Sequence, residues 1–266
     1  MHVAMIVPAD VAEEPLPFAA TVRDLGHRIV TLSVSPLSGA IDPSTMRGLD
    51  LAFVQGYPHI SLGLACALAE SGIRTAMPPL HTMALLDHPL HWRRVLEREG
   101  VPVSPWLRVG PAADLGRDPR VSVLGFPVRV LRVRPGAIEC ELAADRDQLA
   151  AAGSRLGGPR GVIVERYPGG DLLRVFTGLT VAGPLLDTAS EDGRSVLTLG
   201  LARHIEHALE LAGPCVLTMA WERGGLVLES IQLVGDLGPE GAAFRAAGGE
   251  YRAFVESTLL AASATS

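Results

Sequence analysis

The sequence contains no lysine: all 23 of its basic side chains are arginine. This absence excludes every mechanism that uses a lysine side chain. Arginine carries the same charge on a planar fork with a longer reach, so it does not automatically take over the role of a compact ammonium group. Any phosphate site in this protein must therefore be built without lysine.

Other features are scarce as well. A net charge of −6 argues against a nucleic-acid partner, which normally meets a basic face. No run approaches the roughly 18 uninterrupted apolar residues that a membrane span needs. Residues 1–14 are only briefly apolar and have no basic lead, which predicts a first strand and not a signal peptide. Cys66, Cys140 and Cys215 are odd in number and lie far apart in apolar contexts, which predicts buried, reduced thiols in a cytoplasmic protein.

What the sequence does contain is a regular alternation of strand-like and helix-like segments. In residues 1–78 this alternation predicts a small doubly wound α/β domain with a parallel sheet. Later segments pair across turn signals such as Arg134-Pro135-Gly136, which favours α+β architecture. The expected strands are residues 2–7, 28–34, 49–54, 73–76, 127–133, 137–142, 161–167, 172–179, 216–222 and 226–231. The expected helices are one that ends at about residue 25, and residues 60–72, 90–99, 145–156, 201–212 and 251–262.

Six short motifs resemble those of the ATP-grasp ligases, in the same order along the chain. They are similar to motifs of ribosomal-protein glutamate ligases, of the carrier-protein ligase of lysine biosynthesis and of D-alanine–D-alanine ligase. The motifs are residues 51–58, 86–88, 99–106, 126–130, 162–171 and 226–229. The resemblance implies an N-terminal α/β domain (1–78), a central ATP-grasp domain (79–167) and a C-terminal α+β ATP-grasp domain (168–266), with an adenine nucleotide such as ATP bound between the last two.

The resemblance also shows which phosphate-binding residues are missing. The family places one lysine after an aspartate, where this chain has His88, and a second where it has Leu131. Arg129 lies on the same face of the expected strand as Leu131, and Arg132 lies on the opposite face. The alternatives for both arginines are phosphate contact and ordinary surface charge. The glycine-rich phosphate loop of the family is replaced by the tight turn at residues 134–137, which removes the backbone N–H groups that cradle an anion.

The metal site that the resemblance implies is incomplete. The family holds two Mg²⁺ ions with an aspartate on one strand and a Glu-x-Asn pair on the next, and Mg²⁺ requires oxygen ligands. Here the first position falls at Thr218 or Met219, Glu229 keeps the glutamate, and Ile231 replaces the asparagine. Gln232 or Asp236 could compensate if the strand bulges. His204 and His207 have helical spacing but no third ligand nearby, which favours a solvated face.

The adenosine half of the implied site is better retained. Glu165 through Tyr167 occupy the hinge that reads adenine in the family, and Asp171 occupies the position that bonds the ribose hydroxyls. Arg174 corresponds to the arginine of the Asp-x-Arg-Val-Phe motif of the glutamate ligases, with one residue inserted. The alternative is a strand with an acidic turn and no ligand.

Three functions fit these observations. The first is a divergent ATP-grasp homologue with degraded phosphate and Mg²⁺ sites, an unconventional or non-catalytic binding or regulatory member of a bacterial-type biosynthetic pathway. The second is an active, ADP-forming ATP-dependent carboxylate–amine ligase that uses Arg129, Arg132 or Arg174 in place of lysine, through an acyl-phosphate. The third is a fold recruited to chemistry without ATP. A small-molecule or carrier-protein substrate and a homodimer are compatible with the resemblance, but the sequence identifies no acid, amine or protein partner.

Overall fold

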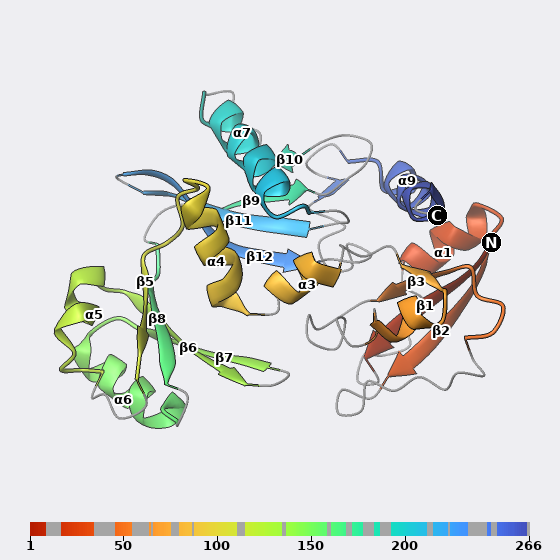
Figure 1. The fold of residues 1–266 in the computed structure, drawn as a ribbon. Coiled ribbons are helices and arrows are strands. Elements are labelled where there is room, and N and C mark those ends of the chain that lie inside the picture. The colour runs from red at the N-terminus through yellow and green to blue at the C-terminus, as the bar shows by residue number, and fades with distance from the viewer. Residues whose placement is uncertain are drawn as a thin grey trace. The chain divides into compact units, whose positions relative to one another are not determined.

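The computed structural model describes most of the chain. The described residues form three four-stranded sheets with helices packed against them (Figure 1). The described segments are residues 1–8, 17–34, 46–54, 64, 66–75, 80–86, 88–110, 115–134, 137–158, 161–168, 172–177, 184–186, 193–211, 215–222, 224–233, 244–245 and 249–264.

The first sheet is parallel, with strand order β2-β1-β3-β4. Its central strand is apolar on both faces: Val3 and Met5 pack in one buried cluster, Ala4 and Ile6 in another. A strand covered on both sides needs such a continuous apolar run. The strands are β1 (His2–Pro8), β2 (Arg28–Val34), β3 (Leu51–Val54) and β4 (Arg74–Thr75), and helix α1 (Pro17–Asp24) follows β1.

The second sheet is antiparallel, with order β5-β8-β6-β7. Alternate residues of β6, such as Val128 and Val130, face a core that they share with Leu149 and Ala152 of helix α6. The residues between them face away from that core, because strand side chains alternate. The elements are β5 (Trp106–Val109), α5 (Pro119–Leu124), β6 (Val128–Arg134), β7 (Ala137–Ala143), α6 (Arg146–Leu156) and β8 (Val162–Arg166).

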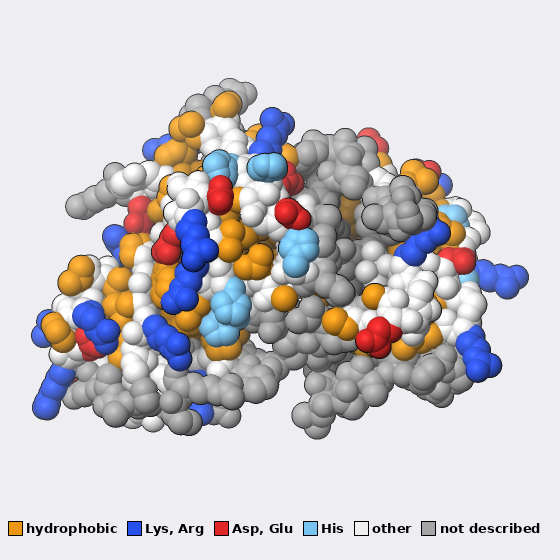
Figure 2. All heavy atoms as spheres, viewed as in Figure 1, with side chains coloured by type: hydrophobic (Ala, Val, Ile, Leu, Met, Phe, Trp, Pro, Cys, Tyr) orange, Lys and Arg blue, Asp and Glu red, His pale blue; other side chains and the backbone are white. Residues whose placement is uncertain are grey.

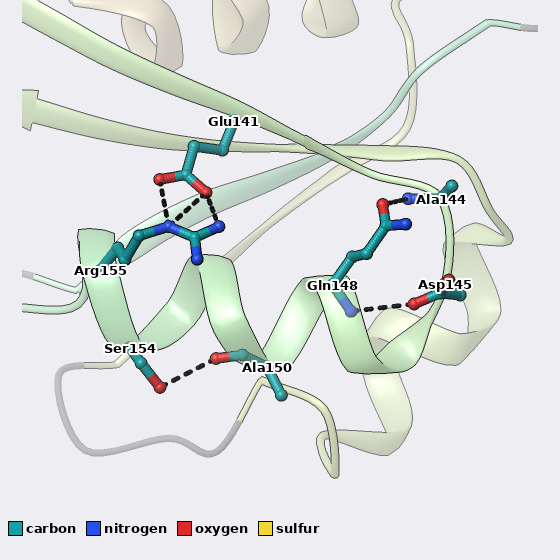
Figure 3. Close-up of polar contacts among 7 residues, drawn as sticks. All are labelled: Glu141, Ala144, Asp145, Gln148, Ala150, Ser154 and Arg155. Atoms are coloured by element: carbon teal, nitrogen blue, oxygen red, sulfur yellow. Dashed lines mark hydrogen bonds and ion pairs between the residues drawn. The ribbon is translucent and has the colours of Figure 1, made fainter.

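Helix α6 is fixed at both ends by side-chain hydrogen bonds (Figure 3). Asp145 caps the helix by accepting from the Gln148 backbone N–H at 2.8 Å, and the Gln148 side chain accepts from the Ala144 N–H at 2.9 Å. Such reciprocal bonds satisfy donors that a helix N-terminus leaves open. Near the other end, the Arg155 fork bonds Glu141 of β7 and holds the pKa of that carboxyl below its ordinary value.

The third sheet has the order β10-β9-β11-β12, with β9 and β10 antiparallel. Its strands are β9 (Leu172–Thr177), β10 (Leu185–Leu186), β11 (Cys215–Glu222) and β12 (Gly225–Leu233). The remaining helices are α3 (Leu80–Leu86), α4 (Pro89–Arg98), α7 (Gly193–Ala208) and α9 (Tyr251–Ala264).

The contacts group the chain into two compact units. One unit contains Met1–Val101, Leu173–Thr218 and Ser230–Ser266, and the other contains Pro102–Leu172 and Met219–Glu229. Each of the three sheets is made from strands of one of the three domains expected from the sequence, although the boundaries of those domains stay a prediction. We call the second unit the Arg129 unit below.

Some helices and strands were not predicted from the sequence, or were predicted with other bounds. These elements lack a regular spacing of apolar residues over several turns or several strand positions. Helix α7 was expected to begin at residue 201 but begins at Gly193. In its first turns the exposed fractions of Val196 and Leu197 are 73% and 62%. The apolar residues of these turns therefore do not follow the buried face of a helix, which is the pattern that identifies one in a sequence. The elements α3, α5 and β10 are too short for a period to emerge.

The described surface carries charges of both signs. On the face drawn in Figure 2, arginine side chains lie scattered among acidic and apolar ones. None of the described helices is long and apolar enough to cross a membrane.

The expectation of three buried thiols is correct only for Cys215. Cys66 and Cys140 are exposed, because Cys140 lies on β7 at the edge of its sheet and Cys66 lies on the outer side of a helical turn. An apolar sequence context does not distinguish an edge strand from a central one.

We expect two thiols of the native protein to react rapidly with a disulfide reagent at pH 8, and the third only after unfolding. Burial raises the pKa of Cys215 to about 12, so almost none of it is thiolate at that pH. Desolvation also raises the pKa of Cys140, so Cys66 should react first. Absorbance of the released thiol measures the rates, and Cys66→Ala should remove the fastest phase. Rapid reaction of all three thiols would contradict the burial of Cys215.

Candidate functional site

The main polar network of the Arg129 unit centres on Arg129 of β6. Arg129 lies directly opposite Glu165 of β8, and opposite residues of antiparallel strands place their side chains on the same face. The Arg129 Nη2 atom lies 2.7 Å from Glu165 Oε1. The same nitrogen donates a hydrogen bond to Glu229 Oε2 on β12. One guanidinium nitrogen therefore holds two carboxylates that come from different strands.

Glu229 reaches this network because β12 is joined to the segment that precedes β5. The Ser104 backbone N–H donates to the Leu228 carbonyl at 3.1 Å, and the Leu228 N–H donates to the Pro102 carbonyl at 2.9 Å. The Ser104 hydroxyl donates to Glu229 Oε1 at 2.8 Å. Both carboxylate oxygens of Glu229 thus bond to groups of the protein itself.

The network is buried, so its charges depend on one another. Glu165 and Glu229 are each 1% exposed, and the Arg129 side chain is 21% exposed. Removing a carboxylate from water is costly unless a cation and hydrogen-bond donors replace the water. Arg129 provides that cation, and its guanidinium carbon lies 5.3 Å from the centre of the Tyr167 ring, an attractive cation–π distance. The Arg129 Nε–H is buried and bonds to none of the described groups.

His88 serves a structural purpose in the other unit. Its Nδ1 atom accepts a hydrogen bond from the Leu90 backbone N–H at 3.2 Å and so caps helix α4. The ring also stacks on His91, with centroids 4.8 Å apart. A ring nitrogen that accepts a hydrogen bond belongs to the neutral form of the imidazole. A contact of His88 with a phosphate stays a prediction.

Two other arginines were predicted for the site, and the structure has them on β6 and β9. Arg132 faces the α6 side of β6, as strand alternation predicts, near Gly158 and 3.7 Å from Glu139. Arg174 is partly buried in β9, in the other unit. Asp171 lies outside the described residues. The roles of these residues in catalysis and ribose binding stay predictions.

The hinge residues use several of their backbone donors within the protein. The Tyr167 N–H donates to the Pro127 carbonyl, and the Arg166 N–H donates to the Pro105 carbonyl, each at 2.9 Å. Glu165 lies between two antiparallel neighbours in the sheet. A base at this hinge would therefore have to be read mainly through other groups, such as the face of the Tyr167 ring. Adenine binding by these residues stays a prediction.

The residues present do not fit the two Mg²⁺ ions that the resemblance implies. Met219 is buried and apolar, Thr218 offers only a neutral hydroxyl, and Ile231 offers no oxygen. Gln232 is exposed, and Asp236 lies outside the described segments. Within those segments, no three His, Cys, Asp or Glu side chains come together as a metal site. Glu229, the remaining candidate ligand, is held by Arg129 and Ser104.

Sequence reasoning missed two features of this network. It did not identify Ser104, because a serine between prolines indicates an extended segment but not its partner. It placed Glu165 at an adenine hinge and Glu229 at a metal, and gave no sign that one arginine joins them. A second pair, Arg166 with Glu222 at 3.3 Å, was missed for the same reason.

Solved structures of ATP-grasp proteins share the fold of this chain. D-alanine–D-alanine ligase from Bacillus anthracis, complexed with ATP, superposes with a TM-score of 0.76 at 15% identity, and the match covers 98% of each chain. The RimK domain protein ATP-grasp from Sphaerobacter thermophilus gives 0.73 at 21% identity, over 97% of this chain and all of the other. Biotin carboxylase from Campylobacter jejuni, in a β-γ-ATP complex, gives 0.69 at 13% identity, over 96% of this chain and 70% of the other.

No known family description and no curated protein matches the chain in sequence. The structural similarity nevertheless extends over nearly the whole chain. The chain therefore has the ATP-grasp fold, which confirms the fold expected from the six motifs. At these identities the similarity concerns the fold alone, because function depends on the residues of the site.

Arg129→Leu is expected to lower the free energy of unfolding by about 3–5 kcal/mol, because it leaves Glu165 and Glu229 buried without their shared cation. Urea unfolding measures the loss. Arg132→Leu is a matched control, since Arg132 is 22% exposed and makes only a 3.7 Å pair, and its loss should stay below about 1 kcal/mol. Adding Glu165→Gln and Glu229→Gln to Arg129→Leu should recover part of the stability. Equal losses for the two single variants would argue against the network.

Proposed function

We propose that this protein is a divergent ATP-grasp homologue that binds an adenine nucleotide through its adenosine half and does not carry out metal-dependent phosphoryl transfer. Its role is then that of a binding or regulatory member of a biosynthetic pathway. The observation that carries the proposal is the engagement of Glu229 by Arg129 and Ser104. Both oxygens of Glu229 already accept hydrogen bonds from the protein, and the guanidinium charge beside them repels a second cation, so Mg²⁺ binding at Glu229 is strongly disfavoured.

The loss of phosphate contacts supports the same proposal. Leu131, in the position of a family lysine, is 7% exposed and apolar. The position of the other lysine holds His88, whose Nδ1 atom caps helix α4. Catalysis of phosphoryl transfer consists mainly of positioning and neutralising the phosphate charges. Without these cations and without metal ligands, the triphosphate would gain little over the nucleoside.

Nucleotide binding itself is supported by the fold and by the hinge. Two structures with this fold, the Bacillus anthracis ligase and the Campylobacter jejuni carboxylase, were solved with ATP or an ATP complex. In this chain the Tyr167 ring beside Arg129 offers a flat surface for a base. Asp171 is the residue proposed to bond the ribose hydroxyls.

An active carboxylate–amine ligase is the second candidate. The observation that favours it is the buried Nε–H of Arg129, which bonds to none of the described groups and could donate to a phosphate oxygen. Arg132 faces the α6 side of β6, opposite to Arg129, and would have to reorient to reach the same anion. In this case the product would be ADP, and arginines would replace the family lysines.

Adenosine, ADP and ATP are expected to bind with affinities within about tenfold of one another, with and without Mg²⁺. The proposed contacts, Tyr167 and Asp171, reach only base and sugar. Isothermal titration calorimetry of the three ligands measures this directly. Asp171→Ala should weaken all three equally, and Glu229→Gln should change none of them. A gain of more than about a hundredfold for ATP on adding Mg²⁺ would contradict the proposal.

Steady release of ADP or phosphate from Mg-ATP should not exceed the buffer blank, with or without amino-acid acceptors. The physical reason is that Glu229, the described carboxylate in the proposed metal position, already contacts the Arg129 guanidinium. A coupled assay for ADP measures the rate. Release that Glu229→Gln abolishes would instead establish the ligase, since that residue would then be acting on the metal.

A further inference from the structure

The resemblance to ATP-grasp proteins implies bound Mg²⁺, but the described residues of this chain do not fit that ion. The position of the Arg129 guanidinium accounts for this. We propose that Glu165 and Glu229 form a cation-binding pair that the chain fills permanently with its own Arg129 guanidinium, so that a divalent ion is excluded as long as Arg129 is present. The proposal concerns the protein without nucleotide; it deepens the proposed function, which rests on the same contact of Glu229 with Arg129, and it is tested without nucleotide so that the two can fail separately.

The geometry is that of two oxygen ligands around one cation. Glu165 Oε1 and Glu229 Oε2 approach the same atom, Arg129 Nη2, from different strands. The Glu165 contact is 2.7 Å, only slightly longer than the 2.3–2.6 Å over which Ca²⁺ binds oxygen. Both carboxylates are fixed, since Glu165 lies within a sheet and Ser104 holds the other oxygen of Glu229. The pair is therefore preorganised for a positive charge.

The charges explain why the guanidinium excludes a metal. Arg129 brings one positive charge to two buried carboxylates. A divalent ion would have to enter beside it against direct repulsion. Replacing Arg129 with alanine removes the cation and leaves space where the guanidinium stood. A divalent ion with its remaining waters could then neutralise both carboxylates, as Mg²⁺ and Mn²⁺ do when bound by one or two carboxylates.

The strand position of Arg129 keeps the guanidinium in place. Arg129 is paired with β8 on one side and β7 on the other, so its backbone cannot move independently. Its guanidinium also lies over the Tyr167 ring. Because the backbone of Arg129 is held in the sheet and its guanidinium is held by Tyr167 and two carboxylates, the positive charge stays at this position. A surface arginine, in contrast, exchanges partners.

The test uses the full chain, stripped of metal with EDTA, and Mn²⁺ as the probe, without nucleotide. The thermal midpoint is measured in EDTA and in MnCl₂, and bound Mn²⁺ is measured by electron paramagnetic resonance. The wild-type midpoint should move by less than about 1 °C. Arg129→Ala should melt lower than wild type in EDTA, rise by about 5 °C or more in saturating Mn²⁺, and bind about one ion per chain.

Two controls make the result specific. Arg129→Ala combined with Glu229→Gln should lose the rise, because one of the two ligands is gone, and Arg132→Ala should behave as wild type. A folded Arg129→Ala that does not respond to Mn²⁺ overturns the proposal, and so does a wild-type response that Glu229→Gln removes. If Arg129→Ala does not fold in EDTA, its refolding yield is compared with and without Mn²⁺. A higher yield with the ion supports the proposal, and equal yields overturn it.

Discussion

The structure of the Arg129 unit depends on the requirement that buried carboxylates have a cation. Glu165 and Glu229 are almost completely buried, and both contact Arg129. Their burial follows from the way the segment 219–229 packs in this unit, where Leu228 bonds to Pro102 and Ser104. Without Arg129, the same packing would place two negative charges together in a region of low dielectric constant. Arg129 on β6 therefore makes it possible for β8 and β12 to bury their carboxylates side by side.

The fold and the chemistry of this chain are separable. The ATP-grasp architecture is retained over nearly the whole chain at sequence identities of 12–21%, because it depends on apolar periodicity, turns and strand order. The chemistry depends on a few charged side chains, and our proposal is that these have changed. The resemblance aligns Leu131 with a lysine and Ile231 with an asparagine of the family, and in the structure Glu229 contacts Arg129. A fold can thus keep the outline of a site whose electrostatics are different.

Much of the fold could be predicted from the sequence, and most of the Arg129 network could not. Strands β1, β6, β7 and β8 were predicted nearly to the residue, since each has a clear apolar pattern bounded by turn residues. The pairing of Arg129 with Glu165 depends on the register of β6 against β8, and β7 and α6 intervene between those strands. No local pattern encodes such a register. Arg129 and Glu229 lie 100 residues apart, so only tertiary packing brings them together.

The Arg129 unit is discontinuous, since it is completed by Met219–Glu229 after the chain has passed through the other unit. This order has a consequence for synthesis on the ribosome. Glu229 leaves the ribosome 100 residues after Arg129, which takes about 5–20 s at ordinary rates of translation. During that interval the nascent chain has β5 to β8 but lacks residues 219–229, which complete the unit. Arg129 and Glu165 then lack Glu229 as their third partner, so the network can form only after that segment has been synthesised.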